Sequence, residues 1–301
     1  MSVYRESSSL ETLLDAGLVQ QLRRIELRTR RVVDADLLGS YRSAFRGSGM
    51  LFSDLREYEP GDDVKSIHWK ASARSGKVYV KSYEEERQLN VLLTLDVSSS
   101  TACGGPRSKH DRAREFAALI SVLARLCGDA LGLCLYGEGV LEFLPARAAR
   151  SQFQAVMLRL LAERRLRPGS DTAGALRAIA ERQRRRAVIF LLSDFFCPPF
   201  EEELRRLAAR HDVICALLSD PADAQPPAAG IVEFIDAESG ERCTRDLSRE
   251  ARRVLSEAHA GRVSELQALC RRSGADLLVV AEHPLQELAR LMRERARRAG
   301  R

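Results

Sequence analysis

Short apolar runs alternate with segments of helical period from residue 89 to the end of the chain. The runs are apolar on both faces, as is typical of strands buried on two sides, and they span 89–96, 131–136, 187–192, 212–218 and 276–281. Between them, apolar side chains recur three or four positions apart at 111–127, 151–163, 172–185, 201–210, 248–272 and 285–298. This alternation predicts a doubly wound α/β fold with a mostly parallel sheet and helices on both faces.

Two short segments interrupt the alternation. Residues 140–144 follow the strand at 131–136 across the short segment 137–139, so we expect them to pair with that strand as a hairpin. Residues 231–245 come after a Pro- and Ala-rich loop at 221–230. They have the pattern of a second small hairpin, which turns at Ser239 and Gly240.

Residues 1–88 have a different pattern. Residues 10–33 indicate one or two amphipathic helices, whereas 39–83 hold several glycines and the only tryptophan in short, strand-like pieces. We therefore expect two units. Residues 1–88 form an N-terminal helical and short-strand region, either packed on the sheet or standing as a small β-rich extension, and residues 89–301 form the α/β domain.

Composition and charge narrow the class of protein. The net charge of +6 comes from 48 Lys and Arg against 42 Asp and Glu, and the basic residues are spread along helical segments as on solvated helix faces. No basic strand with interleaved aromatic residues is found, which argues against a nucleic-acid-binding surface. The seven cysteines are odd in number and never spaced as Cys-x-x-Cys, which indicates reduced thiols and no zinc site.

The sequence also bears on location. Its first residues lack the basic and apolar regions of a signal peptide. No stretch reaches the roughly 18 apolar residues of a membrane span. We therefore expect a cytoplasmic protein without a membrane span.

Two of the predicted strands end in hydroxyl and carboxylate side chains. The strand at 89–96 leads into Asp96, Ser98 and Ser100, and the strand at 187–192 is followed by Asp194. Because ligands of parallel sheets bind at the carboxyl ends of the strands, we expect these side chains to lie at one edge. Thr172 opens the helix that leads into the second strand and is expected at the same edge. These hard oxygen donors suit Mg²⁺ or Mn²⁺.

Each piece of this set also has a simpler interpretation. Ser and Asp residues are common in the turns that follow strands. Asp171 or Thr172 suits the N-cap of a helix, and Asp194 could cap the helix after it. The combination of three pieces, each at the expected end of a strand or helix, favours a metal site.

In this order the residues resemble the metal-ion-dependent adhesion site of von Willebrand factor A domains. That site has Asp-x-Ser-x-Ser, then a Thr at the start of a later helix, then an Asp that ends the next core strand. The resemblance implies that Ser98 and Ser100 bind the metal directly and that Thr172 and Asp194 act directly or through water. It also implies that one metal position is left for a partner's carboxylate.

The loop after Asp194 departs from that family. Phe195 stands where the family more often has Gly, so the loop is expected to differ in shape. The segment 195–200 contains three phenylalanines and should lie beside the metal site. It either anchors the loop in the core or exposes aromatic rings around a metal-centred contact.

A denser match lies at residues 46–88, just before the predicted α/β domain. It resembles a bacterial family catalogued as domain of unknown function 58. The positions that carry it include Arg56, Tyr58, Gly61, Asp62, Trp69 and Arg74. Two interpretations are open for this block. Its charged and aromatic residues (Arg56, Asp62, Asp63, Trp69, Lys70 and Arg74) form a buried cluster that locks the extension to the sheet, or they form an interaction surface.

The resemblance implies a function as well. Members of that family typically occur beside MoxR-type AAA+ ATPases and are thought to act with them in chaperone-like assembly. This implies a non-enzymatic, metal-dependent interaction module whose unknown client presents a carboxylate to Mg²⁺ or Mn²⁺.

Two alternatives come from other classes of protein. The first is a metal-dependent phosphohydrolase or nuclease using Asp96 and Asp194. Against it, Ser98 stands where an Asp-x-Asp phosphatase needs a second carboxylate, and no nucleotide phosphate loop is present. The second is an Arg-rich nucleic-acid binder, whose binding would weaken steeply with salt.

Overall fold

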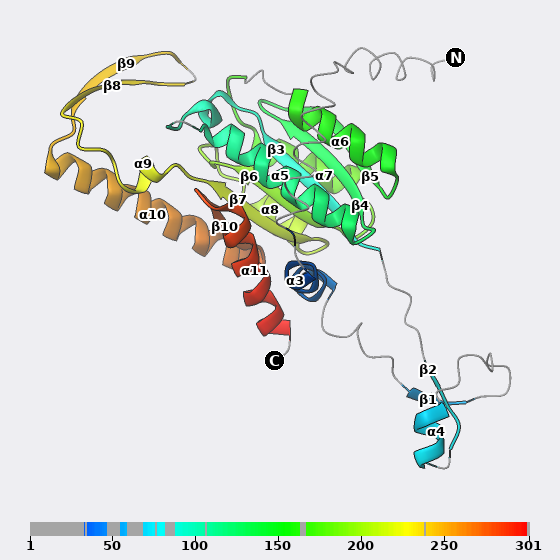
Figure 1. The fold of residues 1–301 in the computed structure, drawn as a ribbon. Coiled ribbons are helices and arrows are strands. Elements are labelled where there is room, and N and C mark those ends of the chain that lie inside the picture. Colours follow the sequence, from blue (N-terminus) through cyan, green and yellow to red (C-terminus); the bar gives the residue numbers. More distant parts are fainter. Residues whose placement is uncertain are drawn as a thin grey trace, which may run out of the picture.

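The computed structural model describes residues 33, 35–46, 55–58, 69–75, 77–81, 88–105, 107–162, 167–237 and 239–299. Its centre is a six-stranded sheet with the strand order β10–β7–β6–β3–β4–β5 (Figure 1). The strands are β3 (Asn90–Asp96), β4 (Ala130–Tyr136), β5 (Val140–Arg147), β6 (Val188–Ser193), β7 (Asp212–Leu218) and β10 (Asp276–Val280). The predicted α/β fold is therefore confirmed.

The sheet is parallel except at one edge, where β5 pairs antiparallel with β4 as predicted. The connections explain this difference, because a short turn joins antiparallel neighbours whereas a parallel neighbour needs a longer crossover. β3 lies in the middle of the sheet. Asp96 pairs with Tyr136 of β4, and Leu95 pairs with Leu192 of β6. This register brings the end of β6 next to Asp96.

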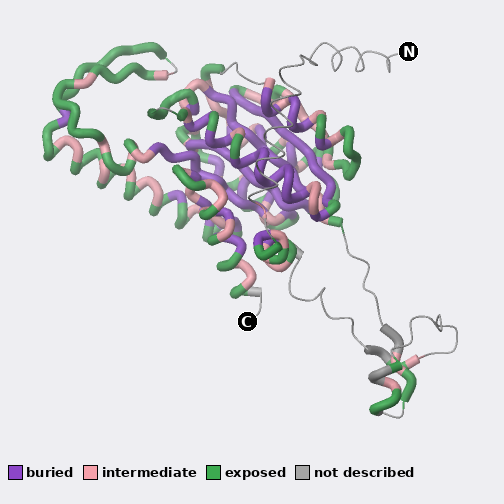
Figure 2. Tube along the Cα trace, viewed as in Figure 1, coloured by how far each residue is buried: buried purple, intermediate pink, exposed green. Residues whose placement is uncertain are grey.

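Helices cover both faces of the sheet. One face carries α5 (Lys109–Leu126), α6 (Arg150–Ala162) and α11 (Pro284–Ala299). The other carries α7 (Thr172–Arg182), α8 (Glu201–Ala208) and α10 (Arg249–Ser273). The inner strands β3, β4, β6 and β7 are buried along almost their whole length, whereas the edge strands β5 and β10 are partly exposed (Figure 2).

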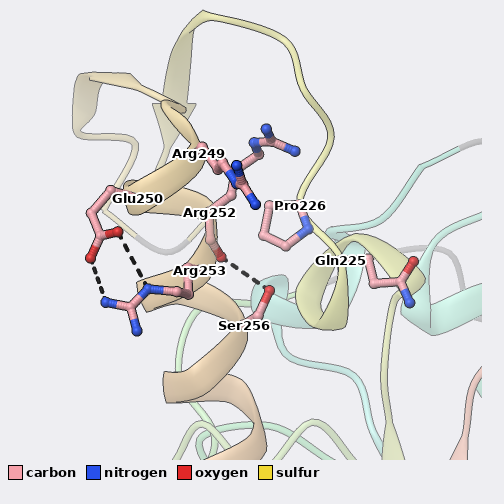
Figure 3. Close-up of a pocket in the computed structure, with 7 residues that line it drawn as sticks. All are labelled: Gln225, Pro226, Arg249, Glu250, Arg252, Arg253 and Ser256. Atoms are coloured by element: carbon pink, nitrogen blue, oxygen red, sulfur yellow. Dashed lines mark hydrogen bonds and ion pairs between the residues drawn. The ribbon is translucent and has the colours of Figure 1, made fainter.

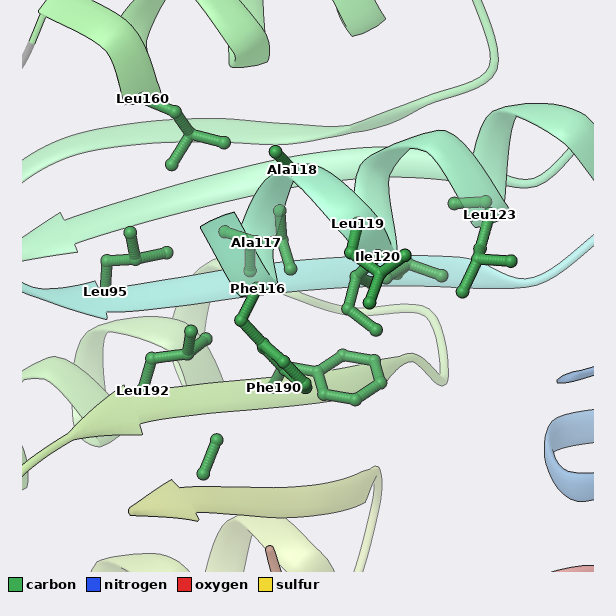
Figure 4. Close-up of a cluster of buried hydrophobic side chains, with 14 of the residues drawn as sticks. Leu95, Phe116, Ala117, Ala118, Leu119, Ile120, Leu123, Leu160, Phe190 and Leu192 are labelled. Atoms are coloured by element: carbon green, nitrogen blue, oxygen red, sulfur yellow. The ribbon is translucent and has the colours of Figure 1, made fainter. Parts of the chain in front are cut away.

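Alternate residues of β3 divide between two hydrophobic cores. Leu93 and Leu95 face α5, whereas Leu92 faces the opposite helices. In the first core Phe116 of α5 meets Phe190 of β6 with ring centroids 6.1 Å apart (Figure 4). Burial on both faces is why these strands read as continuous apolar runs.

Helix α3 (Ala35–Arg46) belongs to the first core. Tyr41 is fully buried, and the ring of Phe45 lies 5.8 Å from that of Phe190. The prediction of strand-like pieces from residue 39 was wrong here, since Leu37, Tyr41 and Phe45 recur at a helical period. The division at residue 88 stays a prediction, and the helices predicted at 10–33 fall almost wholly outside the described residues.

A small unit lies apart from the sheet (Figure 1). It consists of β1 (Leu55–Glu57), paired antiparallel with β2 (Tyr79–Lys81), and α4 (Trp69–Ser75). The helix α4 is a second correction to the strand-like pieces expected at 39–83. Arg56 pairs with Val80 in the two-stranded ladder, and the backbone N–H of Tyr58 donates to Val78 at 2.8 Å.

The buried cluster expected from the family signature is wrong for two of its members. Trp69 is 67% exposed and Arg74 is exposed as well, because both lie on α4 away from the sheet. Gly61, Asp62 and Asp63 lie outside the described residues.

Two features lie between β7 and α10. Part of the predicted 221–230 loop is a short helix, α9 (Pro221–Ala224), whose capping box is made by Asp220 and Asp223. The predicted hairpin is present as β8 (Ile231–Ile235) and β9 (Arg242–Asp246), and nearly all its residues are exposed (Figure 2). Among the described residues, no helix combines the length and apolar composition that crossing a bilayer requires.

Candidate metal centre

Asp96 ends β3 and is completely buried. One carboxylate oxygen accepts the backbone N–H of Ser98 at 2.9 Å. The other accepts the hydroxyls of Ser170 at 2.8 Å and Ser193 at 2.7 Å. The carboxylate therefore holds together three chain segments: its own loop, the loop before α7 and the end of β6.

The two predicted serine ligands follow Asp96 at a 3₁₀ turn, η3 (Ser99–Ala102), with Ser98 just before the turn and Ser100 within it. Their hydroxyls lie 2.9 Å apart, and the Ser100 hydroxyl donates to Asp194 Oδ1 at 3.4 Å. Ser98 precedes this turn but makes no side-chain cap hydrogen bond to it. Its hydroxyl is therefore not explained by a capping role.

Thr172 is the first residue of α7 and is buried. Asp171 caps the helix, accepting the N–H of Gly174 at 2.7 Å, so the Thr172 hydroxyl is left for other contacts. It lies 3.3 Å from the Tyr136 hydroxyl and 3.5 Å from that of Ser170. Through Ser170, Thr172 joins the hydrogen-bond network of Asp96.

The segment before α7 is pinned to the loop that carries the serines. Arg167 forms a parallel bridge with Ser98, and its carbonyl accepts the N–H of Ser99 at 2.7 Å. The N–H of Asp171 donates to Gly137, after β4, at 2.7 Å. Backbone contacts thus fix the two loops side by side at the carboxyl edge of the sheet.

Asp194 follows β6 and is 1% exposed. Its Oδ1 accepts from Ser100 and from the N–H of Phe196 at 3.2 Å. Its Oδ2 is buried and has no hydrogen-bond partner among the described residues. Asp194 does not cap the next helix, because the residue at that position is Phe200. A buried carboxylate oxygen without a donor is costly unless a cation covers it.

The five predicted residues are therefore all brought together, linked by one hydrogen-bond network. Two carboxylates, several hydroxyls and one unpartnered buried carboxylate oxygen form a hard-oxygen donor set that fits a small divalent cation such as Mg²⁺. Among the described residues no group of three or more His, Cys, Asp or Glu forms a metal site. The candidate centre thus depends on its hydroxyl groups.

The electrostatics of the centre follow from its burial. Burial raises the pKa of Asp96, although the hydrogen bonds from Ser193, Ser98 and Ser170 oppose this shift. Burial also raises the pKa of Tyr136 well above its ordinary value, so this residue stays a neutral phenol. A bound divalent cation would favour the ionised form of Asp96.

Three contributors were not predicted as site residues: Ser170, Ser193 and Tyr136. Ser193 directly precedes Asp194, and Ser170 lies shortly before Thr172, so the sequence already showed hydroxyl groups next to the predicted ligands. Their role was not, because both act by donating to Asp96 across the sheet edge. Tyr136 comes from the neighbouring strand and is identified only by the register of β3 with β4.

The loop after Asp194 combines the two interpretations that the sequence left open. Phe195 stacks on the buried Phe200 with centroids 5.5 Å apart, whereas Phe196 is 55% exposed. Phe195 has a φ of 54°, the left-handed conformation that Gly adopts without strain. The backbone here therefore has the glycine-like conformation despite the substitution.

A cavity of about 570 Å³ opens near the start of α10, and none of the five residues lines it (Figure 3). Its walls include Arg249, Arg252 and Arg253 together with Gln225 and Pro226. Arg253 pairs with Glu250 on the same helix. This cavity is separate from the candidate metal centre.

Comparison with known proteins finds relatives that match most of this chain. An uncharacterized protein of Mycobacterium bovis is 33% identical over 272 residues, which cover 88% of this chain and 84% of the relative. An uncharacterized protein of Mycobacterium tuberculosis matches to the same extent.

Two solved structures are similar at a lower level. An aerotolerance-related membrane protein from Bacteroides fragilis shares 14% identity with a TM-score of 0.43, covering 70% of this chain and 99% of its own. The conserved hypothetical protein BatB from Bacteroides thetaiotaomicron shares 14% identity with a TM-score of 0.42, covering 69% and 99%. Likenesses of this extent carry no argument about function.

The family is shown by the sequence itself. The profile described as "Protein of unknown function DUF58" matches residues 54–265, which include the small N-terminal unit, the metal centre and most of α10. The chain therefore belongs to the DUF58 family.

Proposed function

We propose that this chain is a non-enzymatic, metal-dependent protein-interaction module. Mg²⁺ (or Mn²⁺) is held by Asp96, Ser98, Ser100, Thr172 and Asp194, and a client completes its coordination with an Asp or Glu side chain. The buried Oδ2 of Asp194 carries this proposal, because it has no hydrogen-bond partner among the described residues while Oδ1 of the same carboxylate accepts from the Ser100 hydroxyl. Hard cations prefer such oxygen donors.

The hydrogen bonds of Asp96 favour docking over catalysis. Both of its oxygens accept hydrogen bonds from the protein, so Asp96 orients the surrounding hydroxyls and is poorly placed to attack a phosphorus atom. Ser98 occupies the position where an Asp-x-Asp phosphatase needs its second carboxylate. A docking site needs only a metal with one exchangeable position.

The partner in this proposal is a MoxR-type AAA+ ATPase, with which the chain acts in chaperone-like assembly or remodelling of client proteins. Membership of the DUF58 family supports this setting only through what the family resemblance implies about such a partner. We place the protein in the cytoplasm. All seven cysteines lie in the described residues as free thiols, and two of them are exposed, as suits a reducing compartment.

Recovery of the partner on immobilised protein tests the proposal. Wild type and Asp96→Ala are incubated with the MoxR-type ATPase of the same organism and its clients, in Mg²⁺ and in EDTA. Wild type in Mg²⁺ should recover partner, and the other three conditions should not. Equal recovery in all four conditions would falsify metal-dependent docking, and Mg²⁺-dependent phosphoester hydrolysis lost in Asp96→Ala would replace it with the enzymatic alternative.

A further inference from the structure

Arg262 of α10 reaches the rim of the candidate metal centre. Its Nη1 donates to the backbone carbonyl of Asp194 at 2.9 Å. Its guanidinium carbon lies over the ring of Phe196, 3.6 Å from the centroid, and that ring is 55% exposed. Two independent contacts thus hold a planar cation beside a metal ligand and an exposed aromatic ring.

In the described part of the chain, no carboxylate lies within ion-pair distance of this cation, although the charges of Asp194 and Asp223 act on it. Among the described residues, no Asp or Glu forms an ion pair with Arg262, and only one of its five N–H donors has a partner. Arg112 and Arg295, which are also largely buried, both pair with aspartates. Arg262 therefore differs from these two arginines in having no aspartate or glutamate paired with it among the described residues.

The neighbouring cation, Lys109, is compensated. Its Nζ lies 5.5 Å from the centroid of Phe196, but the side chain is only 4% exposed and pairs with Asp223 at 3.0 Å. Of the two cations over this ring, Arg262 is therefore the one whose N–H groups are available to bind a ligand. Burial lowers the pKa of Arg262, and the charges of Asp194 and Asp223 oppose this shift.

We propose that Arg262 binds a second carboxylate of the client, so that the site recognises an acidic peptide segment bearing two carboxylates. The first goes to the metal, as in the proposed function on which this inference rests, and the second goes to the guanidinium. A guanidinium lying on a ring keeps its N–H groups at its edge, where a planar carboxylate binds. The exposed face of Phe196 packs against the methylene groups between the two acids.

Pre-positioning makes Arg262 effective. Its contacts with Asp194 and Phe196 fix the side chain before the client arrives, so little conformational entropy is lost on binding. A charge-assisted hydrogen bond of this kind corresponds to about tenfold in affinity. The expected effect is therefore a preference between peptides, separate from the metal requirement.

The test measures fluorescence anisotropy of four labelled peptides of equal length with the full chain, in Mg²⁺ and in EDTA. The peptides carry no carboxylate side chain, one Asp, an Asp and a Glu two residues apart, or an Asp and a phosphoserine. Wild type should bind the two-carboxylate peptide about tenfold more tightly than the one-carboxylate peptide. EDTA should abolish both interactions.

Arg262→Gln should reduce this preference to about one while retaining binding of the one-carboxylate peptide. Arg271→Gln is the matched control, because it removes the same charge from an exposed position on the same helix and should keep the preference. Arg262→Lys retains the charge without the planar fork and should keep only part of the preference. This variant serves if Arg262→Gln folds poorly.

Each of the other outcomes contradicts either the role of Arg262, the nature of its ligand or the proposed function. An unchanged preference in Arg262→Gln, or an equal loss for both acidic peptides, leaves Arg262 with only a structural role. Tighter, Arg262-dependent binding of the phosphoserine peptide replaces the second carboxylate by a phosphate. If no peptide binds in a chelator-sensitive way, the proposed function fails and this inference fails with it.

Discussion

At the scale of single residues, the two carboxylates of the candidate metal centre have opposite environments. Asp96 has both oxygens occupied by protein donors. Asp194 keeps its Oδ2 buried without a donor in the part of the chain that the structure describes. Asp96 therefore organises the centre, and Asp194 is the residue whose burial is favourable only with a cation bound.

Asp194→Asn should accordingly change stability in opposite directions with and without metal. In EDTA its melting temperature should equal or exceed that of wild type, because a buried carboxylate whose Oδ2 has no donor among the described residues is replaced by a neutral amide. In Mg²⁺ at 100 times its Kd, wild type should gain about 2.7 kcal/mol, roughly 5–10 °C, and the variant should gain almost nothing. Thermal denaturation in both conditions measures this.

The matched control for that experiment is Asp171→Asn. It makes the same chemical change at the same sheet edge, but Asn caps a helix as well as Asp does, so the Mg²⁺ response should persist. A full Mg²⁺ response in Asp194→Asn would show that Asp194 is not part of the metal site.

Phe195 gives a second prediction at this scale. At ordinary positions Ala is better tolerated than Gly, but Phe195 has a φ of 54°. Both Phe195→Ala and Phe195→Gly lose the stacking on Phe200. Only Gly also removes the strain of the left-handed conformation, so Phe195→Gly should be the more stable by about 1 kcal/mol. Urea unfolding measures the difference, and the reverse order would contradict the strained backbone.

At the scale of elements, the two ends of the parallel strands have different roles. The carboxyl ends of β3 and β6 hold the residues of the candidate metal centre. At the amino ends, Arg295 of α11 bridges Asp212 and Asp276 at the starts of β7 and β10, with contacts of 2.6 and 2.7 Å. His211, just before β7, is buried with no hydrogen-bond partner for either ring nitrogen among the described residues.

His211 should make stability depend on pH. Burial lowers its pKa from 6.5, so the unfolded chain binds a proton more readily than the folded one. The stability that the folded chain gains from a neutral His211 is fully present above pH 6.5. It is lost as the pH falls from 6.5 toward the lower pKa that His211 has in the folded protein. The free energy of unfolding of wild type relative to His211→Gln, measured in urea, should therefore decrease below about pH 6.5.

The exposed His283 supplies the control, since His283→Gln should leave that pH profile unchanged. If the free energy of unfolding of His211→Gln varied with pH as that of wild type does, the buried imidazole would not be the cause of the pH dependence.

At the scale of the whole molecule, the chain combines an α/β domain, helix α3 packed on its first core, and a small unit that lies apart (Figure 1). The family match includes both the domain and the small unit. The only tryptophan lies in the small unit and is exposed. Tryptophan fluorescence and far-UV circular dichroism therefore report on different parts of the molecule.

Trp69 emission in the native protein should accordingly be close to that of the chain in urea and should be readily quenched by acrylamide. Tyr41→Ala, which removes a fully buried ring of α3, should lower the circular-dichroism midpoint while leaving the native emission unchanged. A blue-shifted, protected Trp69 would instead favour the buried cluster expected from the sequence.

The periodic part of the sequence was sufficient for most of the fold. Strands such as β3 and β6 are buried on both faces, so their composition alone reveals them. Within 39–83 the predicted short strands are present as β1 and β2, whereas the helices α3 and α4 were missed. Helix α3 derives its helical state from packing of Tyr41 and Phe45 on the sheet. Local pattern is weakest where tertiary contacts decide the conformation.

For the metal centre, the sequence by itself determined the ligand types and their order along the chain. Asp96, Ser98, Ser100, Thr172 and Asp194 were identifiable because strand ends in a parallel sheet meet at one edge. Only the tertiary structure decided which carboxylate oxygens remain available. Oδ2 of Asp96 accepts hydrogen bonds from Ser170 and Ser193, whereas Oδ2 of Asp194 accepts none from the described residues. Arg262, 68 residues from Asp194 in the sequence, reaches the centre only through the packing of α10. Hydrogen-bond partners and charge compensation depend on distances between remote segments, and residue order does not encode these locally.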